Sequence, residues 1–307
     1  MLYQQIARNK RETALIMVLF VVILTLVGAG IGYLFSNSPW IGIIIALIGS
    51  LLYLFITWRN PANMIMSLNQ AQEIQEADNP ELWHIVEDMA MVARVPMPRV
   101  FIIPDPSPNA FATGRDPEHS AVAVTQGILE LMDREELEGV LGHELSHVRN
   151  YDILLSTIAV VLVGVISFIS GMASRSIWSG MASRSIWFFG GSSDRDDDRS
   201  SNAFEMIFKV IAIIFVLILG PISASLAQMA LSRNREYLAD ASSVELTRNP
   251  QGLISALKKI ENSQPMKRAD RSSAGLYIEN PFHNHGLSHL FDTHPPTEDR
   301  IKRLENM

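Results

Sequence analysis

The sequence contains no cysteine. This absence excludes disulfide bonds, thiolate metal ligands and cysteine nucleophiles together. A metal site in this chain must therefore be built from histidine, aspartate and glutamate side chains, which bind metals through nitrogen and oxygen atoms.

A surplus of basic residues is also missing. The formal net charge is -7 and the pI is about 5.6. Such a chain offers no basic surface for the phosphates of DNA or RNA, so we expect no nucleic-acid partner.

Charged residues are absent over 46 consecutive positions, from Thr13 to Trp58. This length suffices for two membrane-spanning helices of about 20 residues each. We place the turn between them at the polar residues 36–39 (Ser-Asn-Ser-Pro). A signal peptide is the alternative for the first run, but that run is too long for one and a second run follows directly.

The flanking charges predict the orientation of this hairpin in the membrane. Basic residues lie at its two outer ends, and the short turn has none. By the positive-inside rule, both ends of the hairpin then face the cytoplasm. The residues concerned are Arg8, Lys10, Arg11 and Arg59.

Two further charge-free runs follow, 153–174 with 22 residues and 210–232 with 23. Each is long enough to cross a membrane, which predicts about four spans in total; a half-inserted helical pair is the alternative. The chain then divides into 1–59 (first hairpin), 60–152 (first part of a polar domain), 153–232 (second pair of spans) and 233–307 (second part of that domain). Between the later spans, residues 171–178 are repeated at 180–187, which we interpret as a duplication in a tolerant loop.

Local patterns predict several elements of the polar domain. Asn79 is a predicted cap for an amphipathic helix that begins at Pro80. Segments 99–103 and 121–124 are strand candidates on either side of a turn-rich stretch, 104–118. A capping-box pattern at Asp133 begins another helix, and Pro250 begins a third, with Leu253, Leu257 and Ile260 on its apolar face. The segment 263–292 has no clear period and is predicted to be loop.

One predicted helix carries His143-Glu144-Leu145-Ser146-His147, which reads H-E-x-x-H. In a helix of 3.6 residues per turn, histidines four positions apart project from one face and can hold a single zinc ion. Glu144 is then placed to act as the general base that takes a proton from a water molecule activated by the metal. The pattern predicts metal-assisted peptide hydrolysis, although so short a match also arises by chance and needs structural context.

A catalytic zinc needs a third protein ligand and one open position. Glu236 is the best candidate, because it follows the fourth apolar run just as His147 precedes the third. Neighbouring antiparallel spans would bring the two residues together across the 89 positions between them. Asp240 shares a helix face with Glu236 and can accept a hydrogen bond from the non-metal nitrogen of a ligand histidine. A solvated charged face is the alternative for both acidic residues.

Four motifs follow one another along the chain: Pro108–Gly114 (PNAFATG), the H-E-L-S-H pattern, Asn234–Asp240 (NREYLAD) and Thr293–Pro296 (THPP). Together with the paired N-terminal spans, they resemble the HtpX family of bacterial membrane zinc metalloproteases, relatives of the CAAX prenyl endopeptidases. The resemblance covers nearly the whole chain. It implies an α-helical membrane protein with an α+β, zincin-like protease domain in the cytoplasm. It also implies one zinc ion on His143, His147 and Glu236, with Glu144 as the base and Asp240 behind the ligands.

The last motif and the preceding loop contain further candidates. His294 matches the family's His-Pro position and would help to stabilise the oxyanion, with Arg300, two turns into the terminal helix, supporting it. Capping of that helix is the alternative for His294. The loop histidines form either a second metal site or a solvated cluster, and solvation is the commoner case; they are His283, His285 and His289.

The resemblance also assigns a role to the first motif, Pro108–Gly114. By resemblance, Asn109, Ala110, Phe111 and Ala112 form the edge that holds the substrate backbone as an added strand. A tight turn that uses Asn109 and Gly114 is the alternative, and it is compatible with this role.

The resemblance implies an endopeptidase of the bacterial plasma membrane that cuts damaged or misfolded membrane proteins at the cytoplasmic face. The alternative from another class is a membrane-anchored scaffold or binding protein with a structural zinc site. A closed structural site would need a fourth protein ligand and would have no use for Glu144. We therefore favour the protease.

Overall fold

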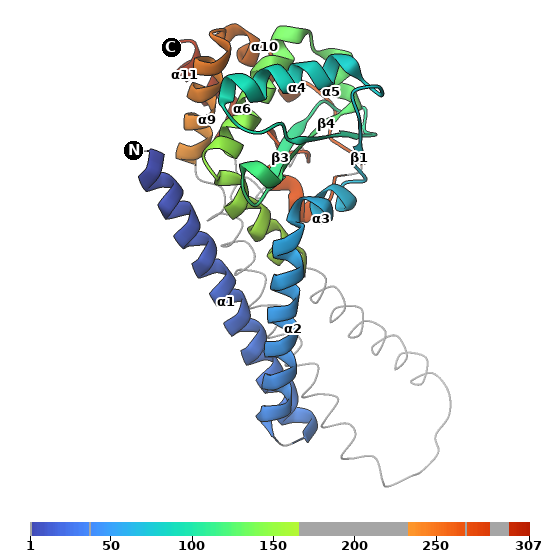
Figure 1. Ribbon diagram of the computed structural model, residues 1–307, viewed down its shortest axis with the longest axis vertical. Helices are drawn as coiled ribbons and strands as arrows, with labels where there is room; N and C mark the ends of the chain where they lie inside the picture. The colour runs from blue at the N-terminus through green and yellow to red at the C-terminus, as the bar shows by residue number, and fades with distance from the viewer. Residues whose placement is uncertain (1, 37, 166–232, 268, 283–294) are drawn as a thin grey trace, which may run out of the picture. The chain divides into compact units, whose positions relative to one another are not determined.

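Two long apolar helices form the N-terminal part of the computed structural model, which describes residues 2–36, 38–165, 233–267, 269–282 and 295–307. Helices α1 (Leu2–Ser36) and α2 (Pro39–Arg59) lie side by side and run in opposite directions (Figure 1). Their backbones approach so closely that a Cβ atom at Gly42 would lie 1.9 Å from the carbonyl oxygen of Gly28. The predicted N-terminal pair of helices is thus confirmed.

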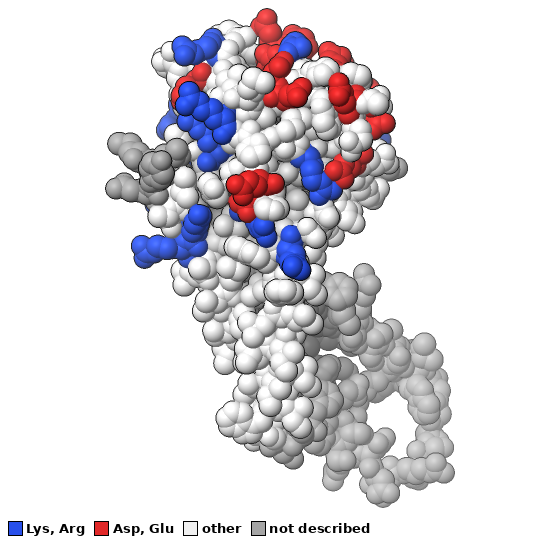
Figure 2. Space-filling view, viewed as in Figure 1, with Lys and Arg blue, Asp and Glu red and all other residues white. Residues whose placement is uncertain are grey.

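The surface of this pair is apolar, as a membrane span requires. Leu26 and Ile45 are each 67% exposed, and the surface over α1 and α2 carries almost no charged side chains along most of its length (Figure 2). Both helices are long and apolar enough to cross a bilayer. Of the predicted third run, residues 153–165 are helical. The rest of it, the tandem repeat and the predicted fourth run lie outside the described residues.

A small mixed sheet lies in the polar part of the chain, with the strand order β1-β2-β4-β3. Strand β1 (Gln72–Glu73) pairs antiparallel with β2 (Arg99–Ile103), and β2 pairs parallel with β4 (Ser120–Thr125). The two predicted strands are therefore confirmed. Strand β3 (Ala110–Gly114) pairs antiparallel with β4 and lies at the edge of the sheet.

The presence of β3 corrects the expectation for 104–118. These residues were predicted to be turn-rich, and a tight turn between Asn109 and Gly114 was the alternative to a substrate edge. Instead, the segment between them is a buried strand in register with β4, with Ala110 opposite Val124. The turn interpretation is wrong. Alanine, threonine and glycine give this strand little hydrophobic alternation, so its sequence pattern is weak.

Helices cover the sheet and carry the predicted signals at their starts (Figure 1). The side chain of Asn79 accepts a hydrogen bond from the backbone of Leu82 at the start of α4 (Pro80–Ala93). Asp133 and Glu136 form a complete capping box on α6 (Arg134–Arg149). Asn249 caps α10 (Pro250–Glu261). The other helical elements are α3 (Pro61–Leu68), η1 (Pro117–His119), α5 (Gln126–Leu131), α9 (Arg233–Thr247), η2 (Arg271–Leu276) and α11 (Thr297–Leu304).

The core lies between the sheet and these helices, so α6 is packed from several sides. The apolar faces predicted for α4 and α10 are both buried in the same core as Val140 and Leu141 of α6. The predicted loop 263–292 contains η2, and its next residues run beside β3, where the backbone N–H of Ile278 donates to the carbonyl of Ala110 at 2.9 Å.

Gly139 sets the distance between α6 and α10, which predicts a specific instability. A Cβ at position 139 would lie 2.7 Å from the backbone nitrogen of Leu253. We expect Gly139→Ala to lower the free energy of unfolding by about 1–3 kcal/mol through overpacking, measured by thermal unfolding of the full chain in detergent. Gly142→Ala is the control, because its new methyl would meet side-chain atoms of Ser243 and Met89 that can move. Equal losses in the two variants would contradict this account.

Candidate metal centre

His143 and His147 project from the same face of α6, and their Nε2 atoms lie close together. These atoms are 3.2 Å apart, and the rings meet edge to face with centroids 4.9 Å apart. His143 is 1% exposed, and His147 is half-buried. The helix therefore presents both imidazoles on one face, as the spacing predicts.

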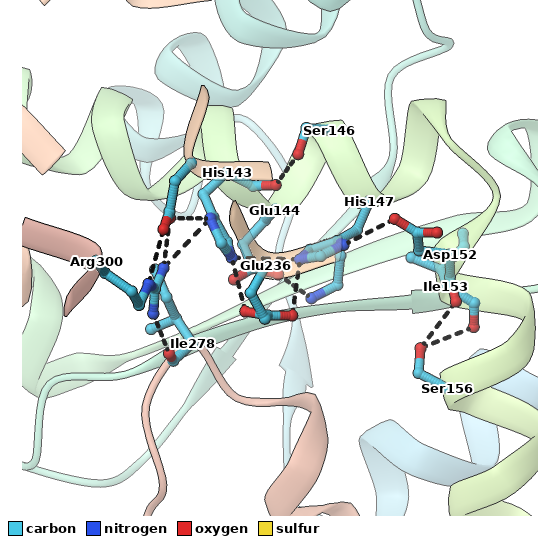
Figure 3. Close-up of polar contacts among 12 residues, drawn as sticks. His143, Glu144, Ser146, His147, Asp152, Ile153, Ser156, Glu236, Ile278 and Arg300 are labelled. Carbon is cyan, nitrogen blue, oxygen red and sulfur yellow. Dashed lines mark hydrogen bonds and ion pairs between the residues drawn. The ribbon is translucent and has the colours of Figure 1, made fainter. Parts of the chain in front are cut away.

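Glu236, from the first turn of α9, faces both histidines. Its Oε2 lies 3.6 Å from Nε2 of His143, and its Oε1 lies 3.6 Å from Nε2 of His147 (Figure 3). Ligand atoms bound tetrahedrally at about 2.0–2.1 Å from zinc are roughly 3.3–3.4 Å apart. The observed separations of 3.2 and 3.6 Å therefore fit one divalent ion of this size.

Each histidine is also held at its other nitrogen by a carboxylate. Nδ1 of His143 lies 2.9 Å from Oδ1 of Asp240, and Nδ1 of His147 lies 3.3 Å from Oδ2 of Asp152. When Nδ1 donates its proton to a carboxylate, the lone pair of Nε2 is directed to the metal position. Sequence reasoning proposed Asp240 for this contact and missed Asp152, whose only signal is its position at the start of the helix that follows α6.

These contacts govern the protonation of the metal-free site. Burial alone would lower the pKa of His143, but hydrogen bonds to Asp240 and Glu236 outweigh it and raise the pKa to about 9. A metal ion at this position must therefore displace a proton, as is general for histidine ligands.

Arg300 lies behind His143 and not beside the metal position. It comes from the first turn of α11, so the expected placement two turns into that helix was wrong. The side chain is fully buried, with Nε and one terminal nitrogen donating to the two oxygens of Asp240 at 2.9 and 2.6 Å (Figure 3). Its other terminal nitrogen donates to the carbonyl of Ile278 at 3.0 Å. These bonds hold Asp240 against His143.

Asp240 is correspondingly stabilised as an anion. Burial favours its neutral form, but the charge of Arg300 and the hydrogen bonds from His143 and Arg300 outweigh this effect. The pKa of Asp240 therefore lies well below its usual value.

Glu144 connects the metal position to the edge strand. Its Oε2 accepts a hydrogen bond from the backbone N–H of Ala112 at 2.7 Å, and burial raises the pKa of the carboxyl group. The neighbouring residues of the predicted substrate edge are also buried. The side chain of Asn109 donates to the carbonyl of Glu279, and the ring of Phe111 packs edge to face against Tyr277 at a centroid distance of 4.9 Å.

A small cavity of about 30 Å³ lies beside these groups and is lined by Ala112, the metal-facing residues and the segment 275–278. This volume has room for about one water molecule. His294 and the loop histidines His283, His285 and His289 lie outside the described residues.

Comparison with known proteins identifies the family. The model for "Peptidase family M48" matches residues 76–307. The chain belongs to peptidase family M48. A protease HtpX homolog from Lactobacillus helveticus is 89% identical and one from Ligilactobacillus salivarius is 59% identical, each aligned over 100% of both chains.

A crystal structure of Ste24p from S. mikatae is also similar, with a TM-score of 0.46 and 17% identity over 98% of this chain and 66% of that one. At this level of similarity nothing about the site is inferred from it. Family M48 membership confirms the resemblance drawn from the motifs. The chain is a membrane metalloprotease, and its substrates are polypeptides.

The pairing of Asp240 with Arg300 predicts the effect of removing one charge. We expect Asp240→Asn to lower stability by about 3–5 kcal/mol, because it leaves a buried guanidinium without its anion. Zinc affinity should fall roughly 10- to 100-fold through loss of the support for His143. Thermal unfolding and zinc competition with a chelator measure the two effects. Asp299→Asn changes an exposed carboxylate next to Arg300 on α11 and is the control, and equal behaviour of the two variants would refute the assignment.

Proposed function

We propose that this M48 protease is a zinc endopeptidase in which His143, His147 and Glu236 hold one catalytic ion. Zinc in such a site lowers the pKa of water and polarises the scissile carbonyl. The convergence of three ligand atoms within 4.8 Å of one another supports this set. Asp240 and Asp152 orient the two imidazoles, and Arg300 positions Asp240.

Glu144 is the proposed general base. Its carboxylate is buried next to the three ligands and hydrogen-bonded to Ala112 of the edge strand. This single contact carries the proposal, because it sets the base between the metal position and the strand along which a substrate would lie. A raised pKa brings the carboxyl group closer to the operating pH, where proton transfer is most efficient.

Substrates are proposed to bind as an extra strand on β3, along Asn109, Ala110, Phe111 and Ala112. Hydrogen bonds to the backbone give affinity with little side-chain selectivity. Such binding suits damaged or misfolded membrane proteins, whose exposed segments share no sequence. His294 is proposed to stabilise the oxyanion, on the basis of the His-Pro motif.

The enzyme is proposed to be a multi-pass protein of the bacterial plasma membrane with its active site in the cytoplasm. Basic residues at the outer ends of α1 and α2, among them Arg11 and Arg59, support this orientation. The scaffold alternative loses its basis, because the chain belongs to a peptidase family.

Glu144→Gln tests the base. We expect the variant to retain zinc and to lose peptide cleavage by about 100- to 10,000-fold, the usual contribution of a general base. Zinc content and cleavage of an unfolded membrane-protein substrate in detergent are measured together, with and without a chelator. Glu138→Gln, on the same helix, is the matched control. Retained turnover in Glu144→Gln would exclude this mechanism.

Glu236→Ala tests the third ligand. Removing the carboxylate leaves two histidines, so we expect zinc content, measured by mass spectrometry, to fall well below one ion per chain. Glu245→Ala changes an exposed glutamate on the same helix and should keep the full content. Full occupancy in Glu236→Ala would reassign the third ligand.

A further inference from the structure

Asn9 is a polar residue in the first apolar helix, and it is 2% exposed. A buried amide is costly unless its donor and acceptor groups are both satisfied. Here they are satisfied by residues far away in the sequence. The amide nitrogen donates to Oδ1 of Asp152 at 2.6 Å, and the amide oxygen accepts from Arg235 at 3.2 Å.

The chemistry of the two partners fixes the orientation of this amide. A carboxylate only accepts hydrogen bonds and a guanidinium only donates them, so the side chain of Asn9 fits in one orientation. Its partners are 143 and 226 positions away in the sequence. The contact therefore joins α1 to the start of the helix after α6 and to the start of α9.

Both partners of Asn9 are directly connected to metal-facing residues. The second oxygen of Asp152 lies 3.3 Å from Nδ1 of His147, and Arg235 immediately precedes Glu236 in α9. Asn9 thus contacts the supports of two ligands that come from different helices. Since it touches neither ligand itself, its effect must pass through Asp152 and Arg235.

Neighbouring contacts hold this part of α1 against the corner that follows α6. The ammonium group of Lys10 lies over the ring of Tyr151, 4.8 Å from its centroid, and Tyr151 has a left-handed backbone with φ 59°. Asn9 also donates to the carbonyl of Asn150 at 3.4 Å. The position of Asn9 is therefore fixed by more than its own two bonds.

We propose that Asn9 is a positioning residue of the metal centre, and that the first membrane helix is part of the catalytic unit as well as an anchor. The amide holds Asp152 in place to orient His147 and holds Arg235 to fix the start of α9. This inference rests on the proposed metal site, and its test separates the two.

Two variants of Asn9 remove different bonds. Asn9→Leu removes all three side-chain hydrogen bonds, whereas Asn9→Asp keeps an acceptor for Arg235 but sets two carboxylates against each other at Asp152. Thr13→Val is the matched control. Thr13 lies one turn further along α1 and is 1% exposed, and among the described residues its hydroxyl bonds only to the carbonyl of Asn9 in its own helix. All measurements use the full chain in detergent.

We expect zinc affinity, measured by chelator competition, to fall about tenfold in both Asn9 variants, the lower end of the range for outer-shell partners. The d–d absorption of the cobalt-substituted protein should also change, whereas Thr13→Val should leave both readouts as in the wild type. Asp152→Asn should lose roughly 10- to 100-fold in affinity. Adding Asn9→Leu to it should cause less further loss than Asn9→Leu causes alone, because the part of its effect that passes through Asp152 is already lost.

The outcomes that overturn the inference are distinct. If the wild type binds zinc and both Asn9 variants bind it equally well with an unchanged cobalt spectrum, the positioning role fails and the proposed function stands. A lower melting temperature with unchanged zinc affinity would reduce Asn9 to a structural contact. Fully additive losses with Asp152→Asn would exclude action through Asp152. A wild type without zinc affinity would overturn the proposed function and this inference together.

Discussion

The ionised groups at the metal centre are almost completely removed from water, so their charges must be compensated inside the protein. Four carboxylates face two guanidinium groups there, which is an excess of two negative charges. A divalent cation balances this excess when both histidines are neutral. The metal-free site takes up protons instead, in agreement with the raised pKa of His143 and of Glu144. The six groups are Glu144, Asp152, Glu236, Asp240, Arg235 and Arg300.

This charge balance explains why the site is assembled from so many elements. The spacing in α6 brings two imidazoles together but leaves their rings free to rotate. Their orientation requires Asp240 from α9 and Asp152 from the next helix, and Asp240 in turn requires Arg300 from α11. Each added group is buried and needs its own partner. His143 is thus supported by Asp240 and Arg300, and His147 is supported by Asp152, which accepts a hydrogen bond from Asn9 of the first helix.

Local patterns in the sequence predicted the parts of the fold that depend on neighbouring residues. The caps at Asn79 and Asp133, the helix that begins at Pro250, the two apolar helices and strands β2 and β4 were found in this way. The position of Glu236 was also inferred, because the order of apolar runs limits which segments can meet. The unpredicted parts depend on tertiary contacts alone. Nothing near Arg300, Asp152 or Asn9 in the sequence shows that a carboxylate or an amide will lie beside it.

Strand β3 illustrates the same limit and has a mechanistic consequence. Its small residues gave no clear period, yet they let the strand lie close to α6, where the backbone N–H of Ala112 reaches Glu144. Several outward-facing groups of β3 have partners in this structure: the carbonyl of Ala110 accepts from Ile278, and the N–H of Gly114 donates to the hydroxyl of Thr157.

In the proposed binding mode, an extended peptide that adds to β3 would compete with these partners for the backbone groups of the strand. If substrates bind there as proposed, a substrate carbonyl that accepts from Ala112 would take the hydrogen bond that holds Glu144. The carboxylate would lose a bond that stabilises its anionic form, and its affinity for a proton would rise. Occupation of the strand edge and activation of the proposed base would then be coupled through one backbone N–H.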